Sequence, residues 1–194
     1  MTVPGPKDPL DVAALTNNQP FCAGVVLLRE GRILATLNPD GLPESLQSTT
    51  CRIGGVGGGQ EPGETLKECA LREAEEETTV KVELIHSPST FFHDMDTGLV
   101  SEITVRDVPA PVLLERMTDS RPNTPYRPGL PTGPYIYFGQ FLAGWRTGAK
   151  ELRPGDDVRA LFYFPVDRWN ELKHPSTPRD LTRRGGGLHS RPRI

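Results

Sequence analysis

The sequence predicts an α/β (α+β) fold in which helices pack on a mixed β-sheet. Three observations support this prediction: a β-hairpin pattern near the start of the chain, one long run of helix-forming residues, and several later runs of β-branched and aromatic residues. Strands that alternate with helices after a first hairpin are typical of a mixed sheet. A chain of 194 residues is also long enough to form one domain around its own core.

The first part of the chain predicts a short helix followed by two strands. Residues 1–19 are rich in Pro, Asn and Asp and form an N-terminal arm, with a short helix expected over 10–15. Residues 21–29 and 32–37 are separated by a Glu-Gly pair, and together they predict a tight β-hairpin. The run 52–59 is so rich in glycine that we expect a turn or a close backbone approach there, and no regular element.

The clearest helix is predicted after Pro62 and Gly63. From there the chain runs to Val80 without another Gly or Pro, and it is rich in Glu, Leu, Ala, Lys and Arg, which are good helix formers. The stretch that follows is β-branched and alternating, which favours a strand. The remaining predicted elements are strands at 80–85, 101–105, 135–145 and 160–164, and a short helix at 166–173.

The predicted domain spans residues 20–173, between the N-terminal arm and a basic tail. Within it, residues 109–134 hold seven prolines. We expect them to form an insertion that lacks regular structure for most of its length, apart from a helical turn at 112–117. Residues 174–194 are rich in Pro, Arg and Gly, and this tail is expected to be poorly ordered.

Charge and cysteine content exclude several classes of protein. The net charge of −3 and pI of about 5.8 are not those of a general nucleic-acid binder. Cys22, Cys51 and Cys69 show no metal-ligand spacing and are odd in number, which indicates free thiols in a reducing compartment. A cytoplasmic protein fits best, because the chain shows neither an export signal nor a run of apolar residues long enough to span a membrane.

Three carboxylates are predicted to converge on one face of the long helix. Glu73, Glu76 and Glu77 stand at positions i, i+3 and i+4, so their side chains leave the helix in similar directions. Like charges at this spacing cost the helix about 0.2–0.5 kcal/mol per pair unless a cation lies between them. Oxygen ligands without His or Cys suit Mg²⁺ or Mn²⁺. The alternative interpretation of any Glu-rich helix is a solvated face.

The surrounding sequence favours the metal site over the solvated face. The stretch from Gly58 to Val80 satisfies the pattern G-x5-E-x7-R-E-U-x-E-E. This pattern resembles the Nudix box, and the flanking strand order extends the resemblance to about 21–173. The members of the pattern are Gly58, Glu64, Arg72, Glu73, Ala74, Glu76 and Glu77.

The resemblance implies a Nudix-type α/β/α sandwich and a metal-dependent hydrolase. Such an enzyme cleaves a pyrophosphate bond in a nucleoside diphosphate linked to another moiety. Glu73, Glu76 and Glu77 would be the metal ligands, and Arg72 would form an ion pair with Glu64 that fixes the helix and the preceding loop. The catalytic set implied by the resemblance is therefore Glu64, Arg72, Glu76 and Glu77, with Mg²⁺ as cofactor and Mn²⁺ as the alternative.

The chain departs from the family pattern at two places. Thr79 stands where the box has Gly, and a left-handed turn would be strained there, which favours a different helix end. The usual upstream Pro-Gly-Gly is replaced by the glycine run that ends at Gly59. Neither departure removes a predicted metal ligand.

Residues outside the acidic cluster supply further candidates. Gly57 and Gly58 would let a phosphate chain approach the backbone, and Arg52 is a candidate phosphate contact. Glu151 and Asp157 precede the last predicted strand and are candidate general bases, each with a solvated loop as the alternative. Four aromatic residues could stack on a base or belong to the core: Phe21, Tyr135, Tyr137 and Phe138.

Two other functions stay open. One is a Nudix-like domain that senses a nucleotide without cleaving it, although an intact acidic cluster argues against a pure sensor. The other is an RNA 5′-pyrophosphate hydrolase helped by the arginines of the basic tail, which is weak evidence in an acidic chain. The expected partner is a small-molecule nucleotide, with no membrane and no nucleic acid favoured. The proline-rich insertion could equally be a dimer contact, which leaves a homodimer open.

Overall fold

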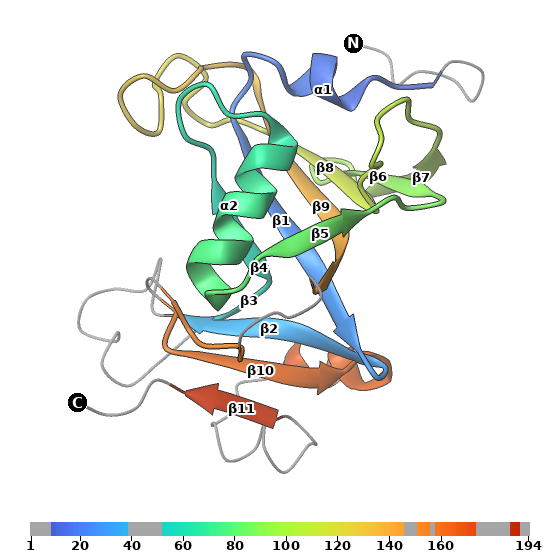
Figure 1. Ribbon diagram of the computed structural model, residues 1–194. Coiled ribbons are helices and arrows are strands. Elements are labelled where there is room, and N and C mark those ends of the chain that lie inside the picture. Colours follow the sequence, from blue (N-terminus) through green and yellow to red (C-terminus); the bar gives the residue numbers. More distant parts are fainter. Residues whose placement is uncertain (1–8, 39–51, 146–150, 156–157, 174–186, 191–194) are drawn as a thin grey trace. The chain divides into compact units, whose positions relative to one another are not determined.

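The computed structural model describes residues 9–38, 52–145, 151–155, 158–173 and 187–190 (Figure 1). The chain forms two compact units. Unit 1 comprises Met1–Val25, Gly57–Glu73 and Leu84–Leu142; unit 2 comprises Val26–Val56, Ala74–Glu83 and Ala143–Ile194. Both are rich in strands and poor in helix, so the predicted α+β class with a mixed sheet is confirmed.

The sheet of unit 1 is mixed. Strand β6 (Thr90–Asp94) pairs antiparallel with β7 (Leu99–Ile103) and parallel with β8 (Leu113–Thr118). Strand β8 pairs antiparallel with β9 (Tyr135–Trp145). With β1 (Phe21–Arg29) beside β9, the strand order runs β1-β9-β8-β6-β7. The predicted strands at 101–105 and 135–145 correspond to β7 and β9, whereas no strand was predicted at β6.

Strand β8 lies where a helical turn was predicted at 112–117, and that prediction was wrong. The segment contains Leu, Glu, Arg and Met, which are good helix formers. It nevertheless pairs with a neighbouring strand on each side. Residues Leu113–Thr118 pair with β9, and residues Leu113–Arg116 pair with β6. Two sets of strand pairings therefore override the local helix preference of this segment.

The predicted hairpin is confirmed as strands β1 (Phe21–Arg29) and β2 (Arg32–Asn38). The glycine run forms two short strands, β3 (Arg52–Gly54) paired with β2 and β4 (Val56–Gly59) paired with β1. The prediction of no regular element there was wrong. The prediction of a close backbone approach was right, because a Cβ on Gly57 would lie 2.5 Å from the Cα of Gly24. Glycine thus permits a close strand pairing.

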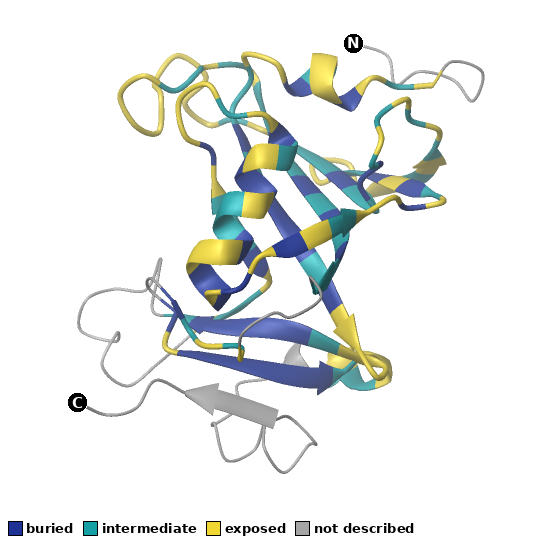
Figure 2. Ribbon diagram, in the orientation of Figure 1, coloured by how far each residue is buried: buried dark blue, intermediate teal, exposed yellow. Residues whose placement is uncertain are grey.

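Helix α2 (Leu66–Thr78) is the predicted long helix. It begins with a capping box, because the Thr65 hydroxyl accepts the backbone N–H of Glu68 at 3.3 Å and the Glu68 carboxylate accepts the backbone N–H of Thr65 at 2.9 Å. Figure 2 shows buried and exposed residues alternating along the helix. Leu66 packs on β9 so closely that a Cβ on Gly139 would lie 2.4 Å from it.

Unit 2 is built on β10 (Ala160–Pro165), which pairs antiparallel with β2 along six residue pairs. Its core cluster is Ala35, Leu37, Ala160, Phe162 and Phe164, with Ile53 packed against it. The predicted short helix follows as a 3-10 helix, η2 (Val166–Lys173).

Strand β11 (Gly187–Ser190) pairs antiparallel with β10 on the side away from β2. These four residues belong to the predicted basic tail, whose poor order stays a prediction. The rest of that tail lies outside the described residues. The remaining elements, α1 (Val12–Thr16) and β5 (Val82–Ile85), fall where a short helix and a strand were predicted.

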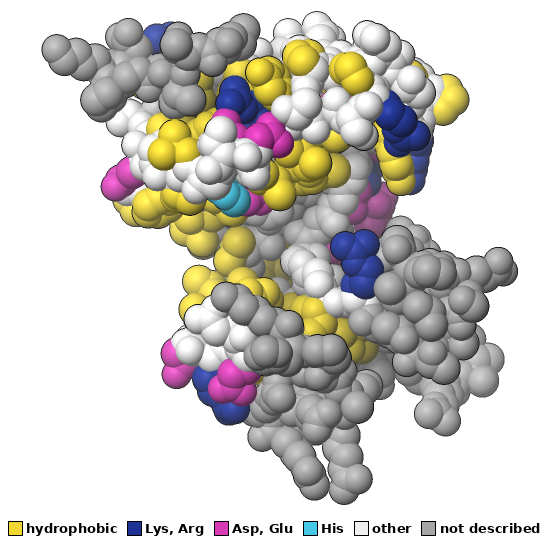
Figure 3. Space-filling model, turned by 180° about the vertical axis from the view of Figure 1, so that it is seen from behind, with side chains coloured by type: hydrophobic (Ala, Val, Ile, Leu, Met, Phe, Trp, Pro, Cys, Tyr) yellow, Lys and Arg dark blue, Asp and Glu magenta, His cyan; other side chains and the backbone are white. Residues whose placement is uncertain are grey.

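Hydrophobic side chains remain visible at the surface on the face displayed in Figure 3. Among large apolar residues, Leu99 and Val100 of β7 are 54% and 58% exposed. In the part of the chain that the structure describes, no helix combines the length and the apolar character needed to cross a membrane. The homodimer stays a prediction.

Candidate active site

The predicted ion pair between Glu64 and Arg72 is confirmed. The guanidinium donates from Nε to Oε1 at 2.7 Å and from Nη2 to Oε2 at 3.0 Å, which is bidentate geometry. Arg72 Nη2 also donates to the carbonyl of Gly59 at 2.8 Å. The hydrogen bond from Arg72 holds the pKa of the Glu64 carboxyl below its usual range, and the same bond raises the pKa of the guanidinium. One arginine thus joins helix α2 to the loop before it.

Arg72 also holds the first predicted metal ligand. Its Nη1 donates to Glu73 Oε1 at 2.8 Å. On the other side, Gly58 lies directly against this carboxylate, because a Cβ built on Gly58 would come within 2.5 Å of Glu73 Oε2. The absence of a side chain at Gly58 is therefore what leaves room for the carboxylate. Both contacts fall within unit 1.

Glu76 and Glu77 lie in the last turn of α2, in unit 2. Glu76 is exposed, whereas Glu77 is only 8% exposed. The carbonyls at this helix end are capped by a strap at 153–155: Gly155 N–H donates to Glu77 O at 2.9 Å and Arg153 N–H to Thr78 O at 3.2 Å. A Cβ on Gly155 would lie 1.9 Å from the carbonyl oxygen of Glu76, so this approach requires glycine.

Helix α2 ends in a left-handed turn in spite of the Thr. Thr79 has φ 59°, and its N–H makes the last helical hydrogen bond, to Glu75 O at 2.8 Å. This is the αL helix ending that glycine usually provides. The expectation of a different helix end was wrong, because the strap at 153–155 bonds the final carbonyls and keeps the chain in this path.

The donor chemistry of Glu73, Glu76 and Glu77 fits a hard divalent cation, because all three offer carboxylate oxygens. Among the described residues, however, no three His, Cys, Asp or Glu side chains come together closely enough to hold an ion. The Glu73 carboxylate is turned toward Arg72 and Gly58. The metal set therefore stays a prediction on the chemistry of its ligands.

The other predicted residues have different surroundings. Arg52 is exposed at the start of β3, and Gly57 lies against β1. The side chain of Glu151 is 75% exposed and lies 3.7 Å from an Arg153 nitrogen. Asp157 lies outside the described residues. Phosphate binding by Arg52 and the role of general base for Glu151 or Asp157 stay predictions.

Two adjoining cavities in unit 1 lie beside residues 59–65, the segment that leads into helix α2 and is called the box loop. The first, called the aromatic cavity, has a volume of about 240 Å³, and Gly59 is part of its lining. It is lined by strand residues and by the proline-rich insertion: Cys22, Gly59, Arg121, Tyr126, Ile136 and Phe138. Of the predicted aromatic residues, Phe21 and Phe138 line this cavity. Tyr137 is buried core at 3% exposure, and Tyr135 packs under the Arg116 guanidinium.

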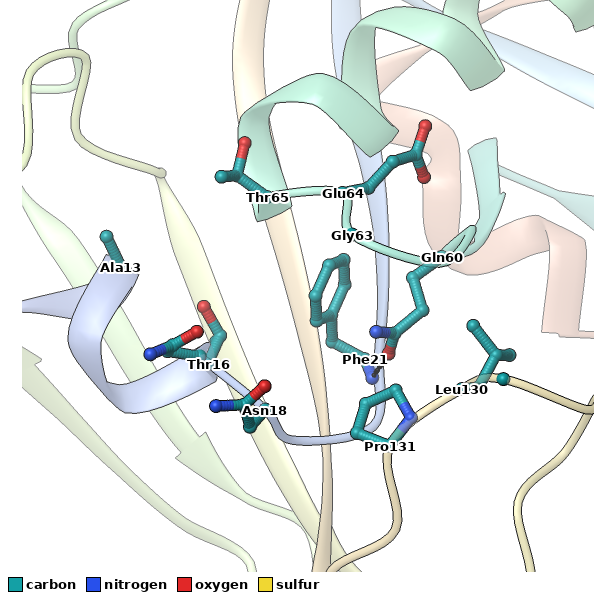
Figure 4. Close-up of a pocket in the computed structure, with 12 residues that line it drawn as sticks. Ala13, Thr16, Asn18, Phe21, Gln60, Gly63, Glu64, Thr65, Leu130 and Pro131 are labelled. Atoms are coloured by element: carbon teal, nitrogen blue, oxygen red, sulfur yellow. Dashed lines mark hydrogen bonds between the residues drawn. The ribbon is translucent and has the colours of Figure 1, made fainter.

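The second, called the amide cavity, has a volume of about 310 Å³ (Figure 4). It lies between α1, the box loop and the insertion, and it is lined by Thr16, Asn17, Asn18, Gln60, Glu64 and Pro131. The two cavities share Phe21, Gln60, Leu130 and Pro131. Sequence reasoning found neither Gln60 nor Tyr126, because no motif marks a residue that lines a cavity.

Two of the cysteines are free thiols, as predicted for Cys22 and Cys69. Burial raises the pKa of the Cys69 thiol to about 12, and burial also raises the pKa of Cys22, with a smaller effect from Glu73. Neither thiol is activated as a nucleophile in this environment. Cys51 lies outside the described residues.

Comparison with known proteins assigns the family. Residues 19–185 match the model of the NUDIX domain. No curated protein matches the chain significantly. Similar solved structures include a NUDIX hydrolase from Nitrosomonas europaea, at 14% identity and a TM-score of 0.44, where the match covers 76% of this chain and 58% of that chain.

Two further solved structures are similar over more of their own length. An ADP-ribose pyrophosphatase from Streptococcus suis shows 16% identity and a TM-score of 0.43, with 76% of this chain and 75% of that chain covered. A MutT NUDIX hydrolase from Burkholderia pseudomallei shows 18% identity and a TM-score of 0.46, with 84% and 92% covered.

Proposed function

The chain belongs to the NUDIX domain family and is a hydrolase of pyrophosphate bonds, and on this premise we propose that its substrate is a nucleoside diphosphate linked to another group. The observation that carries the proposal is the chain of contacts from Glu64 through Arg72 to Glu73 and Gly58, with the next residue, Gly59, in the lining of the aromatic cavity. In this proposal, a site for a phosphate chain would adjoin a site for a base.

Glu73, Glu76 and Glu77 would hold Mg²⁺, or Mn²⁺ in its place, through their carboxylate oxygens. The metal, when bound, polarises the phosphoryl oxygens and stabilises the leaving phosphate. The role of Arg72 is positioning: it fixes the Glu73 carboxylate and ties it to Glu64. Attack of a water molecule on one phosphorus would form a new P–O bond and break the bridging P–O bond, so that the other phosphate leaves, while Glu151, Asp157 or a glutamate of the box would accept the proton of the water.

The base of the substrate would occupy the aromatic cavity. Phe21, Tyr126 and Phe138 line it with aromatic side chains, and Arg121 and Asp119 of the insertion add one charge of each sign. The cavity volume of about 240 Å³ suits a nucleotide base. A small-molecule nucleotide, rather than nucleic acid, is the proposed partner, and the free thiols of Cys22 and Cys69 accord with a cytoplasmic enzyme.

The test is metal-dependent turnover of box variants. Glu76→Gln and Glu77→Gln remove a charged ligand while keeping side-chain volume, and each should lower kcat by at least about 100-fold if the metal is lost. Glu75→Gln is the matched control, because Glu75 is exposed on the same helix and pairs with Lys81 at 3.7 Å. It should retain activity.

Product analysis by mass spectrometry identifies the bond that is cut. The panel is ADP-ribose, dinucleoside polyphosphates, NADH, nucleotide sugars and nucleoside triphosphates, each with Mg²⁺ and with a chelator. Metal-dependent release of a nucleoside monophosphate from one class supports the proposal. Tight binding of one compound without cleavage, or full activity of both glutamate variants, would instead favour a nucleotide sensor.

A further inference from the structure

We propose that the amide cavity binds a neutral, hydroxyl-rich group, so that the moiety linked to the nucleoside diphosphate is a sugar and not a phosphate. This inference rests on the proposed function for the identity of the whole substrate. The cavity itself can be tested without turnover. The evidence is a glutamine amide whose donor is unused and accessible at the cavity, a lining without cations, and the position of the cavity beside the aromatic cavity.

Gln60 provides the unused donor. Its residue is only 6% exposed, and its Oε1 accepts the backbone N–H of Phe21 at 2.6 Å. Because that N–H can only donate, the atom facing it must be the carbonyl oxygen, which fixes the amide orientation. The Nε2 group is left to face the cavity (Figure 4), and within the described part of the chain it meets no acceptor. The residue is buried as a whole while this nitrogen is accessible at the cavity, so a donor held in a fixed orientation is available to a ligand that brings an acceptor.

The other polar groups of the cavity suit hydroxyls. Thr16 donates its hydroxyl hydrogen to Val12 O at 2.9 Å, which leaves its oxygen lone pairs available as acceptors. Asn17 and Asn18 are exposed at the end of α1 and line the same cavity with amides that both donate and accept. A sugar hydroxyl can donate to one of these groups and accept from another, whereas a phosphate oxygen only accepts.

The charge of the residues that line the amide cavity also favours a neutral group over a phosphate. None of the described residues that line the cavity is Lys, Arg or His. Its single ionisable side chain is Glu64, and that charge is neutralised by the bidentate bond to Arg72. A phosphate placed here would lose hydration and gain no cation, which is unfavourable. The aromatic cavity differs, because Arg121, Asp119 and three aromatic side chains line it.

Position completes the argument. The two cavities share Phe21 and Gln60, and both adjoin the box loop, where Gly59 and Glu64 are held together by Arg72. A nucleoside in one cavity and a sugar in the other would place the joining diphosphate between them, at this loop. The volume of about 310 Å³ is larger than a phosphate needs and suits a monosaccharide with ordered water.

The first experiment measures binding without metal or turnover. The ¹⁵N-labelled full chain is titrated with ribose and, separately, with inorganic phosphate, and side-chain amide signals are followed by NMR. Ribose has about ten heavy atoms, so a dissociation constant in the millimolar range is expected. Shifts of the Gln60 and Asn17 side-chain amides with ribose but not phosphate support the inference. No shift with ribose, or shifts with phosphate, would overturn it.

The second experiment uses substrates. Gln60→Glu keeps the acceptor for Phe21 N–H but replaces the donor, so it should raise KM for a nucleotide sugar by about 10-fold more than for a nucleoside triphosphate. Asn17→Ala, at the exposed rim, should shift this ratio in the same direction and cannot disturb the core. Asn170→Ala, exposed in η2, is the control and should leave the ratio unchanged.

The outcomes separate the two proposals. Equal effects on both substrate types would overturn the sugar assignment while the enzyme itself stays active. If no substrate is cleaved at all, the proposed function fails, yet the ribose and phosphate titrations still decide what the amide cavity binds.

Discussion

The helix end at Thr79 allows a quantitative prediction. Thr79 is exposed and has φ 59°, a left-handed conformation that costs an L-residue about 1–2 kcal/mol, with β-branched side chains at the upper end. Thr79→Gly removes this strain. It also adds the conformational freedom of glycine to the unfolded chain, which costs about 0.5–1 kcal/mol. The lost hydrogen bond from the Thr79 hydroxyl to Arg153 O is long, at 3.4 Å, and exposed.

The net expectation is that Thr79→Gly stabilises the protein by about 1 kcal/mol, which raises Tm by about 2–4 °C in a chain of this size. The assay is thermal unfolding followed by circular dichroism or calorimetry. Thr132→Gly is the matched control, because Thr132 is exposed and its φ is negative, and it should lower stability by about 0.5–1 kcal/mol. Equal losses of stability in both variants would refute the argument from left-handed strain.

Two further predictions follow from the box. Gly58→Ala should weaken metal activation by about 10-fold, because its Cβ would displace the Glu73 carboxylate. Gly55→Ala is the control and should leave metal activation unchanged, because no atom lies within 4 Å of the added Cβ. Titration of activity with Mg²⁺ compares the two variants. Glu64→Gln should cost about 1–3 kcal/mol at pH 7, measured by urea unfolding. The bond to Arg72 lowers the pKa of Glu64, so the carboxylate's contribution to folding stability is fully present above the unfolded pKa of about 4.3. This contribution is lost as pH falls through the folded-state pKa. A stability difference between wild type and Glu64→Gln that stays the same at about pH 3 would contradict the prediction.

Elements governed by local pattern were predicted from the sequence. The hairpin of β1 and β2 follows from two strand-like runs joined by a Glu-Gly pair, and α2 follows from an uninterrupted run of helix formers. Strands β8 and β3 were not predicted. Their local preferences point to a helix and a turn, and they become strands because distant segments pair with them. Pairings of this kind are set by the whole fold and leave no mark within a short window.

The residues of the candidate site also fall into those that a local pattern predicts and those that it does not. The bond between Glu64 and Arg72 was predicted because both residues belong to one motif of fixed spacing, and a motif encodes the contacts among its own members. The partners outside the motif could not be predicted. Gln60 precedes the box helix without any pattern of its own, and Tyr126 lies in an insertion that reads as irregular, yet both line cavities.

The glycine run shows why a motif residue needs the fold before its role can be assigned. Sequence reasoning gave Gly57 and Gly58 one shared purpose, room for a phosphate chain. The structure gives them two different neighbours: the backbone at Gly24 for Gly57, and the Glu73 carboxylate for Gly58. A side chain at Gly57 would therefore disturb strand pairing and hence folding, whereas one at Gly58 would act on a predicted metal ligand. Stability and metal affinity should consequently separate these two substitutions, although both lie in strand β4 and remove the same kind of residue.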